Sequence, residues 1–168
     1  MACRPISQIA YDAGTTTVDA NGTRHNVIAG QVVKKVQATA TDSAYIMPSA
    51  ASDDTANANP YAFALETNIN APANGLYIPF NYKSNNDLVG CCLTHGALLE
   101  LWNDGTGAVF TDNAATAPAG TLLYVDANGI LDNAAAGNAG EVGTDVAVAE
   151  VVKPAADANG VLTIKTLI

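Results

Sequence analysis

The chain has 168 residues, of which 49% are hydrophobic and 14% charged, so it can bury the core of one ordinary domain or of two very small ones and is not disordered throughout. Its net charge is −9, and the stretch between Lys83 and Lys153 holds nine carboxylates and no Lys or Arg. This stretch carries the whole acidic excess, which repels phosphate backbones and argues against direct nucleic-acid binding.

Membrane insertion and secretion are not expected either. No stretch reaches the run of about 20 apolar residues that a bilayer-spanning helix needs. Residues 1–14 lack the apolar segment of a secretory signal, so we expect the protein to be made in a reducing cytosol. The three cysteines, Cys3, Cys91 and Cys92, do not form a disulfide framework, and we predict buried free thiols.

The N-terminal segment differs from the rest of the chain. We predict an extended arm over residues 1–14, followed by a single β domain over residues 15–168. The apolar side chains of the arm need a surface to pack on, such as that of a neighbouring molecule. Its candidate interface residues are Arg4, Pro5, Ile6, Ile9 and Tyr11.

Short apolar or alternating runs, bounded by turn residues and repeated roughly every ten residues, dominate the remaining chain. We find no long amphipathic helical pattern. Together these features predict an all-β fold, a compact β-barrel or β-sandwich with long loops. The runs are 26–38, 61–66, 75–82, 88–102, 108–111, 120–126, 129–133, 146–152 and 160–168.

The tetrapeptide Asp-Ala-Asn-Gly occurs three times, at 19–22, 126–129 and 157–160. Asp favours the first position of a type I turn, Asn tolerates left-handed backbone, and Gly adopts positive φ without strain. A calcium-binding EF-hand loop needs further acids at fixed offsets and a closing Glu, which no copy has. We therefore predict hairpin turns rather than metal sites.

A second internal similarity relates residues 27–66 to residues 117–150. In each segment an Ala-Gly turn leads into an aliphatic strand, a polar connector follows, and an alternating strand ends in Glu. The pattern fits an ancient duplication, and it also fits the low-complexity loops of many β proteins. Two long loops, 49–60 and 103–120, are of the size that is usually functional or mobile.

The sequence offers little for catalysis, because it has no nucleophile elbow, P-loop, zinc-protease or dinucleotide-binding motif. Cys91 and His95 would lie about 13 Å apart on a flat strand, too far for a catalytic pair or a shared metal site. We interpret His95 as a core or half-buried histidine. We expect no enzyme activity, no metal and no cofactor. Trp102 is an interface anchor, a sugar-stacking platform or a cap on the core at the end of a strand.

Residues 118–152 read PAGTLLYVDANGILDNAAAGNAGEVGTDVAVAEVV and resemble the second half of tailed-bacteriophage capsid decoration (cement) proteins. In that family an Ala-Gly turn leads into a Leu-Tyr-x-Asp strand, a Gly turn and a further strand, and a polar connector precedes a Val-Ala strand. Residues 27–51 are similar to the first half. The resemblance covers less than half of the chain, and residues 70–95 have no counterpart in it.

The resemblance implies a non-enzymatic all-β protein of β-tulip-like form, located on the virion. Such a protein binds the major capsid protein on the outside of the capsid as a homo-oligomer, usually a trimer, and its N-terminal arm adds a strand to a capsid or neighbouring chain. One alternative is a head- or tail-fibre module directed at carbohydrate, with Trp102, Tyr77 and Tyr82 as stacking residues. Another is a small hydrolase that uses the scattered carboxylates.

Overall fold

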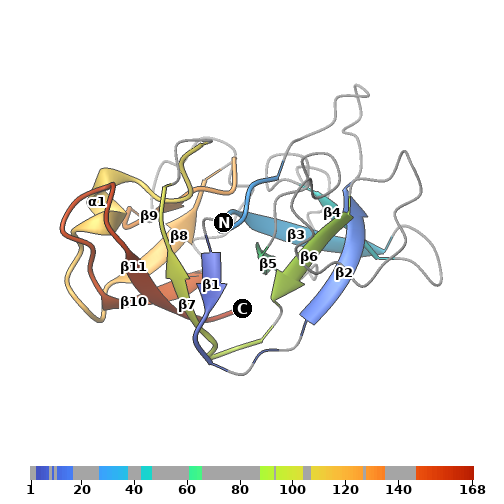
Figure 1. The fold of residues 1–168 in the computed structure, drawn as a ribbon, viewed down its shortest axis with the longest axis horizontal. Helices are drawn as coiled ribbons and strands as arrows, with labels where there is room; N and C mark the ends of the chain where they lie inside the picture. Colours follow the sequence, from blue (N-terminus) through green and yellow to red (C-terminus); the bar gives the residue numbers. More distant parts are fainter. Residues whose placement is uncertain are drawn as a thin grey trace.

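A computed structural model confirms the predicted all-β fold (Figure 1). It describes residues 3–7, 9, 11–16, 27–37, 43–46, 61–65, 88–92, 94–103, 107–126, 128–134 and 147–168. These residues form β1 (Cys3–Pro5), β2 (Tyr11–Thr16), β3 (Val32–Gln37), β4 (Ser43–Ile46), β5 (Tyr61–Ala64), β6 (Leu88–Cys92), β7 (Leu98–Leu101), α1 (Asp112–Ala115), β8 (Leu122–Val125), β9 (Leu131–Asp132), β10 (Ala149–Lys153) and β11 (Leu162–Thr166).

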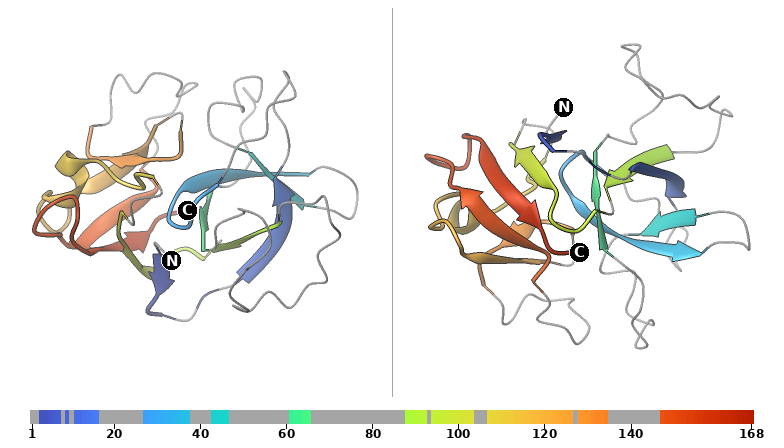
Figure 2. Two further views of the ribbon diagram at one scale, coloured as in Figure 1. Left: turned by 45° about the horizontal axis from the view of Figure 1, so that its top comes forward. Right: turned by 90° about the horizontal axis from the view of Figure 1, so that it is seen from below.

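The strands form two sets that lie side by side (Figures 1 and 2). Six antiparallel strands make a sheet in the order β1-β7-β11-β10-β8-β9. The other five pair in a closed ring in the order β2-β4-β3-β5-β6, in which β2 and β4 are parallel.

One hydrophobic core joins the sheet and the ring. Phe63 of β5 and Cys92 of β6 contribute to it from the ring, and Leu99 of β7 and Ile164 of β11 contribute from the sheet. All four side chains are fully buried. Burying a large apolar side chain stabilises a fold by roughly 1.5–3 kcal/mol, so the two sets of strands stabilise each other through this shared core.

The ring and the sheet share a strand topology. We call strands β2–β6 the first unit and strands β7–β11 the second unit. The first unit pairs in the order β4-β3-β5-β6-β2, and the second pairs in the corresponding order β9-β8-β10-β11-β7. The parallel pairing of β2 with β4 closes the first unit, and in the second unit Phe110 makes a parallel bridge to Leu131 of β9.

The hydrogen bonds at the start of β3 and β8 also correspond. Gly30 donates its N–H to the carbonyl of Ala64 at 2.7 Å, and Gly120 donates its N–H to the carbonyl of Val151 at 2.8 Å. Both glycines have positive φ, 98° and 88°, which other residues rarely adopt. Ala64 thus corresponds to Val151.

Two of the three Asp-Ala-Asn-Gly copies form hairpin turns as predicted, and the copy at 19–22 lies outside the described residues. Between β8 and β9, Asp126 Oδ1 accepts two backbone N–H groups at 2.8 Å, one of them from Asn128. Between β10 and β11, Asp157 Oδ1 accepts the N–H of Asn159 at 2.8 Å. These carboxylates therefore stabilise their own turns.

The turn between β8 and β9 also connects the two units. Gln31, buried just before β3, donates from Nε2 to the carbonyl of Asn128 at 3.2 Å, and its Oε1 accepts the N–H of Ile28 at 3.0 Å. Val32 donates its N–H to the carbonyl of Gly129 at 2.8 Å. A turn of the second unit is thereby hydrogen-bonded to the start of β3 in the first unit.

Asn103, directly after Trp102, holds a second long-range connection. Its Nδ2 donates to the carbonyl of Ala158 at 2.9 Å and to that of Phe110 at 3.3 Å. Its Oδ1 accepts the N–H of Val109 at 2.8 Å. One amide side chain thus joins the end of β7, the chain before α1 and the turn between β10 and β11.

The predicted extended arm over residues 1–14 is wrong for the residues described there. Residues 3–5 form β1 at the edge of the sheet and pair with β7, and residues 11–16 form β2 within the ring. Cys3 is fully buried in the shared core. The short strands had no clear alternation in the sequence, and long-range pairing rather than local preference determines their position.

The outer edge of β1 is poorly suited to receive another strand. Ile6 donates its N–H to the carbonyl of Leu98 at 2.9 Å, so the N–H groups of alternate residues point toward β7. Pro5 occupies the other kind of position and has no N–H to offer on the open side. Proline at such a place is a common protection of an edge strand.

The predicted run 88–102 is two strands separated by a turn. The turn begins at Thr94 and is held by Thr166, which is fully buried in β11. Thr166 Oγ1 accepts the N–H of Ala97 at 2.9 Å and donates to the carbonyl of Thr94. His95 is exposed in this turn, so its interpretation as a core or half-buried histidine is wrong.

Loop 103–120 contains more regular structure than predicted. The N–H of Ala114 donates to Thr111 Oγ1 at 3.2 Å, which caps the N-terminus of α1. Ala114 and Ala115 of this short helix are buried in the core. The predicted strand over 75–82 lies outside the described residues.

Candidate interaction surface

The surface of the sheet that faces away from the core is the main candidate for a functional site. Side chains alternate between the two faces along each strand, as in β7, where Leu99 and Leu101 are buried and their neighbours are not. We call the outward positions, taken from strand register, the outer sheet face; Thr163 belongs to it by register but is buried. They are Arg4, Ile6, Leu98, Glu100, Trp102, Leu122, Tyr124, Asp132, Glu150, Val152, Lys153, Val161, Thr163 and Lys165.

Exposed apolar side chains gather on the outer sheet face. Within the described residues, four large hydrophobic side chains are exposed: Ile6 at 47%, Leu122 at 44%, Val152 at 41% and Val161 at 47%. All four belong to this face. One step beyond the Leu101–Leu162 pair, the register places Trp102 opposite Val161. Apolar residues that gather on one face are typical of an interaction site.

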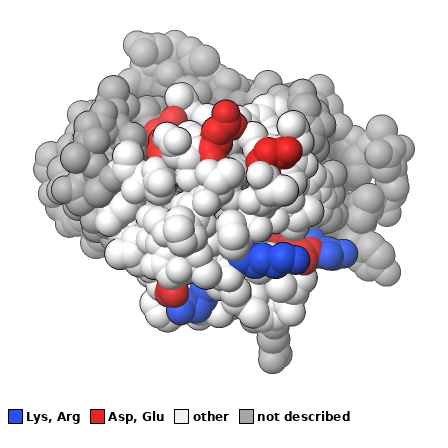
Figure 3. All heavy atoms as spheres, turned by 90° about the vertical axis from the view of Figure 1, so that its left-hand side faces the viewer, with Lys and Arg blue, Asp and Glu red and all other residues white. Residues whose placement is uncertain are grey.

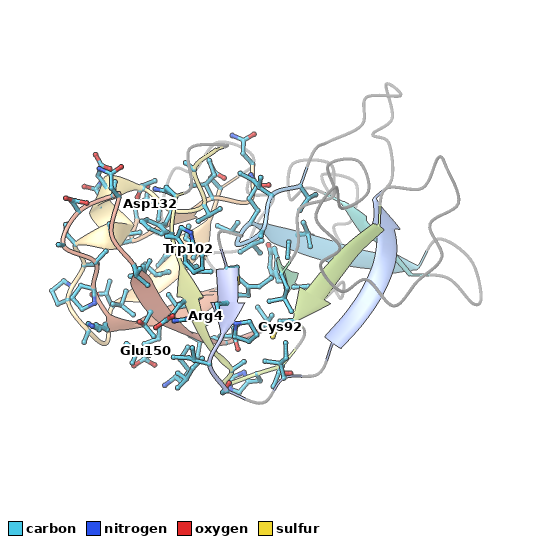
Figure 4. All side chains as sticks on the ribbon, viewed as in Figure 1. Arg4, Cys92, Trp102, Asp132 and Glu150 are labelled. Carbon is cyan, nitrogen blue, oxygen red and sulfur yellow. The ribbon has the colours of Figure 1, made fainter. Side chains whose placement is uncertain are left out.

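Two cross-strand ion pairs lie on the same face. Arg4 Nε donates to Glu100 Oε2 at 2.9 Å, and Lys165 Nζ lies 2.7 Å from Glu150 Oε2. Figure 4 shows Arg4 on β1, Trp102 directly after β7 and Glu150 on β10. Exposed pairs of this kind contribute at most about 1 kcal/mol to stability, and their larger effect is to neutralise bases within an acidic chain.

A β-bulge in β10 changes the outward side chains at the end of this strand. The register between β10 and β11 shifts between Val151 and Lys153, so that Val152 and Lys153 are both exposed next to Thr163. A regular strand would turn one of these two neighbours toward the core. Bulges commonly redirect a side chain at a functional surface.

The first unit uses the same face for packing. Strand register defines three pairs of equivalent positions, in which the first member belongs to the shared buried core and the second to the outer sheet face. The pairs are Val32 and Leu122, Phe63 and Glu150, and Cys92 and Lys165. The face that joins the first unit to the rest of the molecule is therefore exposed in the second unit.

The predicted interface residues have different locations. Arg4 and Ile6 lie on the outer sheet face, as does Trp102, which is partly buried. Pro5 is partly buried, and Ile9 packs against the shared core. The side chains of Tyr11, Tyr77 and Tyr82 lie outside the described part of the structure.

Sequence reasoning missed Leu122, Val152, Lys153 and Val161. The adjacent valines before Lys153 interrupt the alternation of the run, which is the one local sign of the bulge. The remaining members of the face are recognisable only once the strands are placed in register.

Cys3 and Cys92 are free thiols in the core, as predicted, and the Cys91 side chain lies outside the described part of the structure. Burial raises the pKa of Cys3 to about 12, with a smaller contribution from the negative charge of an ionised Cys92. Burial also raises the pKa of Cys92, against hydrogen bonds from Thr94 that lower it. High pKa values leave both thiols protonated and poorly nucleophilic.

Carboxylates are separated from bases at the end of the molecule that carries α1. In Figure 3 the upper acidic groups of this end stand apart from the basic groups, which lie lower and next to other carboxylates. Asp112 in α1 and Asp157 in the turn between β10 and β11 are exposed. The outer sheet face, where bases and acids balance, differs from this acidic surface.

In the described ranges, no cluster of three or more His, Cys, Asp or Glu side chains is arranged to hold a metal ion. The same residues include no helix with the length and apolar character to cross a bilayer. Scans against protein-family models and against curated proteins found no match to this sequence. The outer sheet face is therefore interpreted from its own chemistry.

Proposed function

We propose that the protein is a structural component of a bacteriophage particle, which binds the outer surface of the capsid and stabilises its lattice. The observation that carries the proposal is the outer sheet face, where exposed aliphatic residues surround neutralised charges. Its composition suits a protein partner, because aliphatic side chains gain from burial and paired charges need no new counterions. The major capsid protein is the proposed partner.

The sequence resemblance gives the proposal its biological setting. Residues 118–152 contain β8, β9 and the start of β10, and residues 27–51 contain β3 and β4. These are corresponding parts of the two units, as expected if the resemblance reflects the duplicated architecture of a capsid-binding β protein. The virion surface is the proposed location.

Binding to a lattice does not require strong single contacts. A capsid repeats the same site many times, and an oligomer that engages several sites gains avidity from its effective concentration. We therefore also propose a homo-oligomer, with a trimer favoured. Because Pro5 protects the edge of β1, the face of the sheet rather than strand addition at this edge is the proposed binding surface.

The test is quantitative peptide mass spectrometry on density-purified particles from cells that make the protein. A copy number comparable to that of the major capsid protein supports a role over the whole lattice. A few to a few dozen copies per particle would indicate a fibre or tail module instead. Absence from particles would rule out the virion assignment.

A further inference from the structure

One base of the outer sheet face forms no ion pair within the described part of the chain. The guanidinium of Arg4 pairs with Glu100. The ammonium of Lys165 pairs with Glu150. Lys153 is exposed at the end of β10 and has no ion pair with the described residues. The charges of Arg4 and Lys165 are balanced by their partners, so the positive potential of this face is centred on Lys153.

The surroundings of Lys153 are apolar. The bulge in β10 places Val152 beside Lys153, opposite Thr163 of the neighbouring strand, and Val161 lies two residues before Thr163 on the same side of the sheet. Val152 is 41% exposed and Val161 is 47% exposed. A lysine flanked by two exposed valines has the character of an anchor point, since its charge gives direction and the valines give burial.

An exposed lysine at the end of a strand is solvated by water and needs no partner, so Lys153 alone would not support the proposal of a binding site. Two further observations distinguish this position. The bulge exposes Val152 and Lys153 together, and the equivalent face of the first unit is buried as a packing surface. The same face is thus suited to contact in both units. In the first unit it packs against the rest of the chain, and in the second unit it faces outward, where a partner can bind.

We propose that Val152, Lys153 and Val161 form the anchor of the outer sheet face. The partner is an acidic protein surface that places an Asp or Glu carboxylate against Lys153, between aliphatic side chains. Charge complementarity selects this occupant, because the exposed ammonium of Lys153 attracts a carboxylate, and the exposed Val152 and Val161 favour aliphatic contacts around it.

Nucleic acid is the less suitable occupant. Its phosphates would gain a single lysine, and the exposed valines beside it offer them no contact, whereas the aliphatic side chains of a protein can pack on those valines. The identity of the partner as a capsid protein rests on the proposed function, whereas the chemistry of the anchor does not. The two can therefore be tested separately.

The first test measures co-sedimentation of the purified protein with particles that have been stripped of it. Lys153→Glu is expected to weaken binding at least about tenfold, and Lys153→Arg to bind within about threefold of wild type. Asp157→Asn, a charge change at the acidic end, serves as the matched control and should bind like wild type. Because Lys153 is exposed, its variants should be as stable as wild type, and urea unfolding of each variant checks this.

A zero-length carbodiimide, which joins an amine to a carboxylate as an amide with loss of water, identifies the contact. Mass spectrometry should find Lys153 linked to an Asp or Glu of a capsid protein. A link to a second copy of this chain would overturn the partner assignment in favour of self-association. If Lys153→Glu binds particles as well as wild type does, and no link forms at Lys153, the anchor is wrong. The proposed function would remain in place.

A probe independent of particles completes the design. Amide NMR shifts are followed during titration with a synthetic peptide of alternating Leu and Glu, with a Leu and Gln peptide and a DNA oligonucleotide for comparison. Shifts confined to Val152, Lys153 and Val161 that need Glu support the anchor, even if the protein fails to bind particles and the proposed function fails. A response to DNA alone, or to neither peptide, would overturn it.

Discussion

Replacement of Asn103 by alanine tests whether one side chain connects three distant segments. The change removes donations to the carbonyls of Ala158 and Phe110 and leaves the N–H of Val109, a fully buried residue, without its acceptor. A protein hydrogen bond contributes about 0.5–1.5 kcal/mol net, and an unsatisfied buried donor costs about 1–3 kcal/mol. The expected loss for Asn103→Ala is therefore about 2–4 kcal/mol.

Urea unfolding, followed by the fluorescence of Trp102, measures this loss. With an m-value of about 2 kcal/mol per molar, in the middle of the usual range of about 1–3, the midpoint should fall by roughly 1–2 M and the m-value should stay constant. Asn133→Ala is the control, because Asn133 is exposed after β9 and should change stability by no more than about 0.5 kcal/mol. If Asn103→Ala costs no more than this control, the three hydrogen bonds do not stabilise the fold and our reasoning is wrong.

Three further predictions concern backbone strain, a buried hydroxyl and a thiol. Gly96→Ala should cost the roughly 1–2 kcal/mol expected for left-handed strain, because a Cβ at Gly96 would meet no atom within 4 Å. Gly30→Ala should cost more, because a Cβ at Gly30 would lie 3.1 Å from Val109. Equal losses in thermal unfolding would contradict this close approach. Thr166→Val keeps the shape but leaves a buried N–H unpaired, so a loss of about 1–3 kcal/mol and faster exchange of that amide are expected, and unchanged exchange would count against the bond. The pKa of Cys3 is raised by burial to about 12, so above the ordinary thiol pKa the unfolded chain binds fewer protons than the folded one and stability should fall as pH rises toward about 12. Cys3→Ala should make this alkaline slope shallower, and identical slopes would show that the thiol titrates normally.

The turns and the strands with strong patterns could be predicted from the sequence. Two Asp-Ala-Asn-Gly copies became hairpin turns because the residue types needed are local, and β11 falls within a run where apolar residues alternate. The N-terminal strands could not be predicted in this way. Cys3 is buried because of its pairing with Leu101 nearly a hundred residues later, and no local pattern carries that information.

The candidate site was predictable only in part. Arg4, Ile6 and Trp102 were predicted as interface residues, but Arg4 and Ile6 were assigned to an extended arm, whereas the described residues there form β1 and β2. Their common face arises from register across several strands, which is a long-range property. The position of Lys153 depends on a bulge, whose sequence signature is no more than two adjacent valines.

The position of β7 between the first and the last strand has a mechanical consequence. β1 and β11 are both antiparallel to β7, so they run in the same direction, and the start of β1 and the end of β11 lie at opposite ends of this three-strand group (Figure 1). A pull between the ends loads both ladders lengthwise, so their hydrogen bonds must rupture together rather than one after another. Tension transmitted through the termini therefore meets this three-strand group as a shear clamp, with β7 as the element held from both sides.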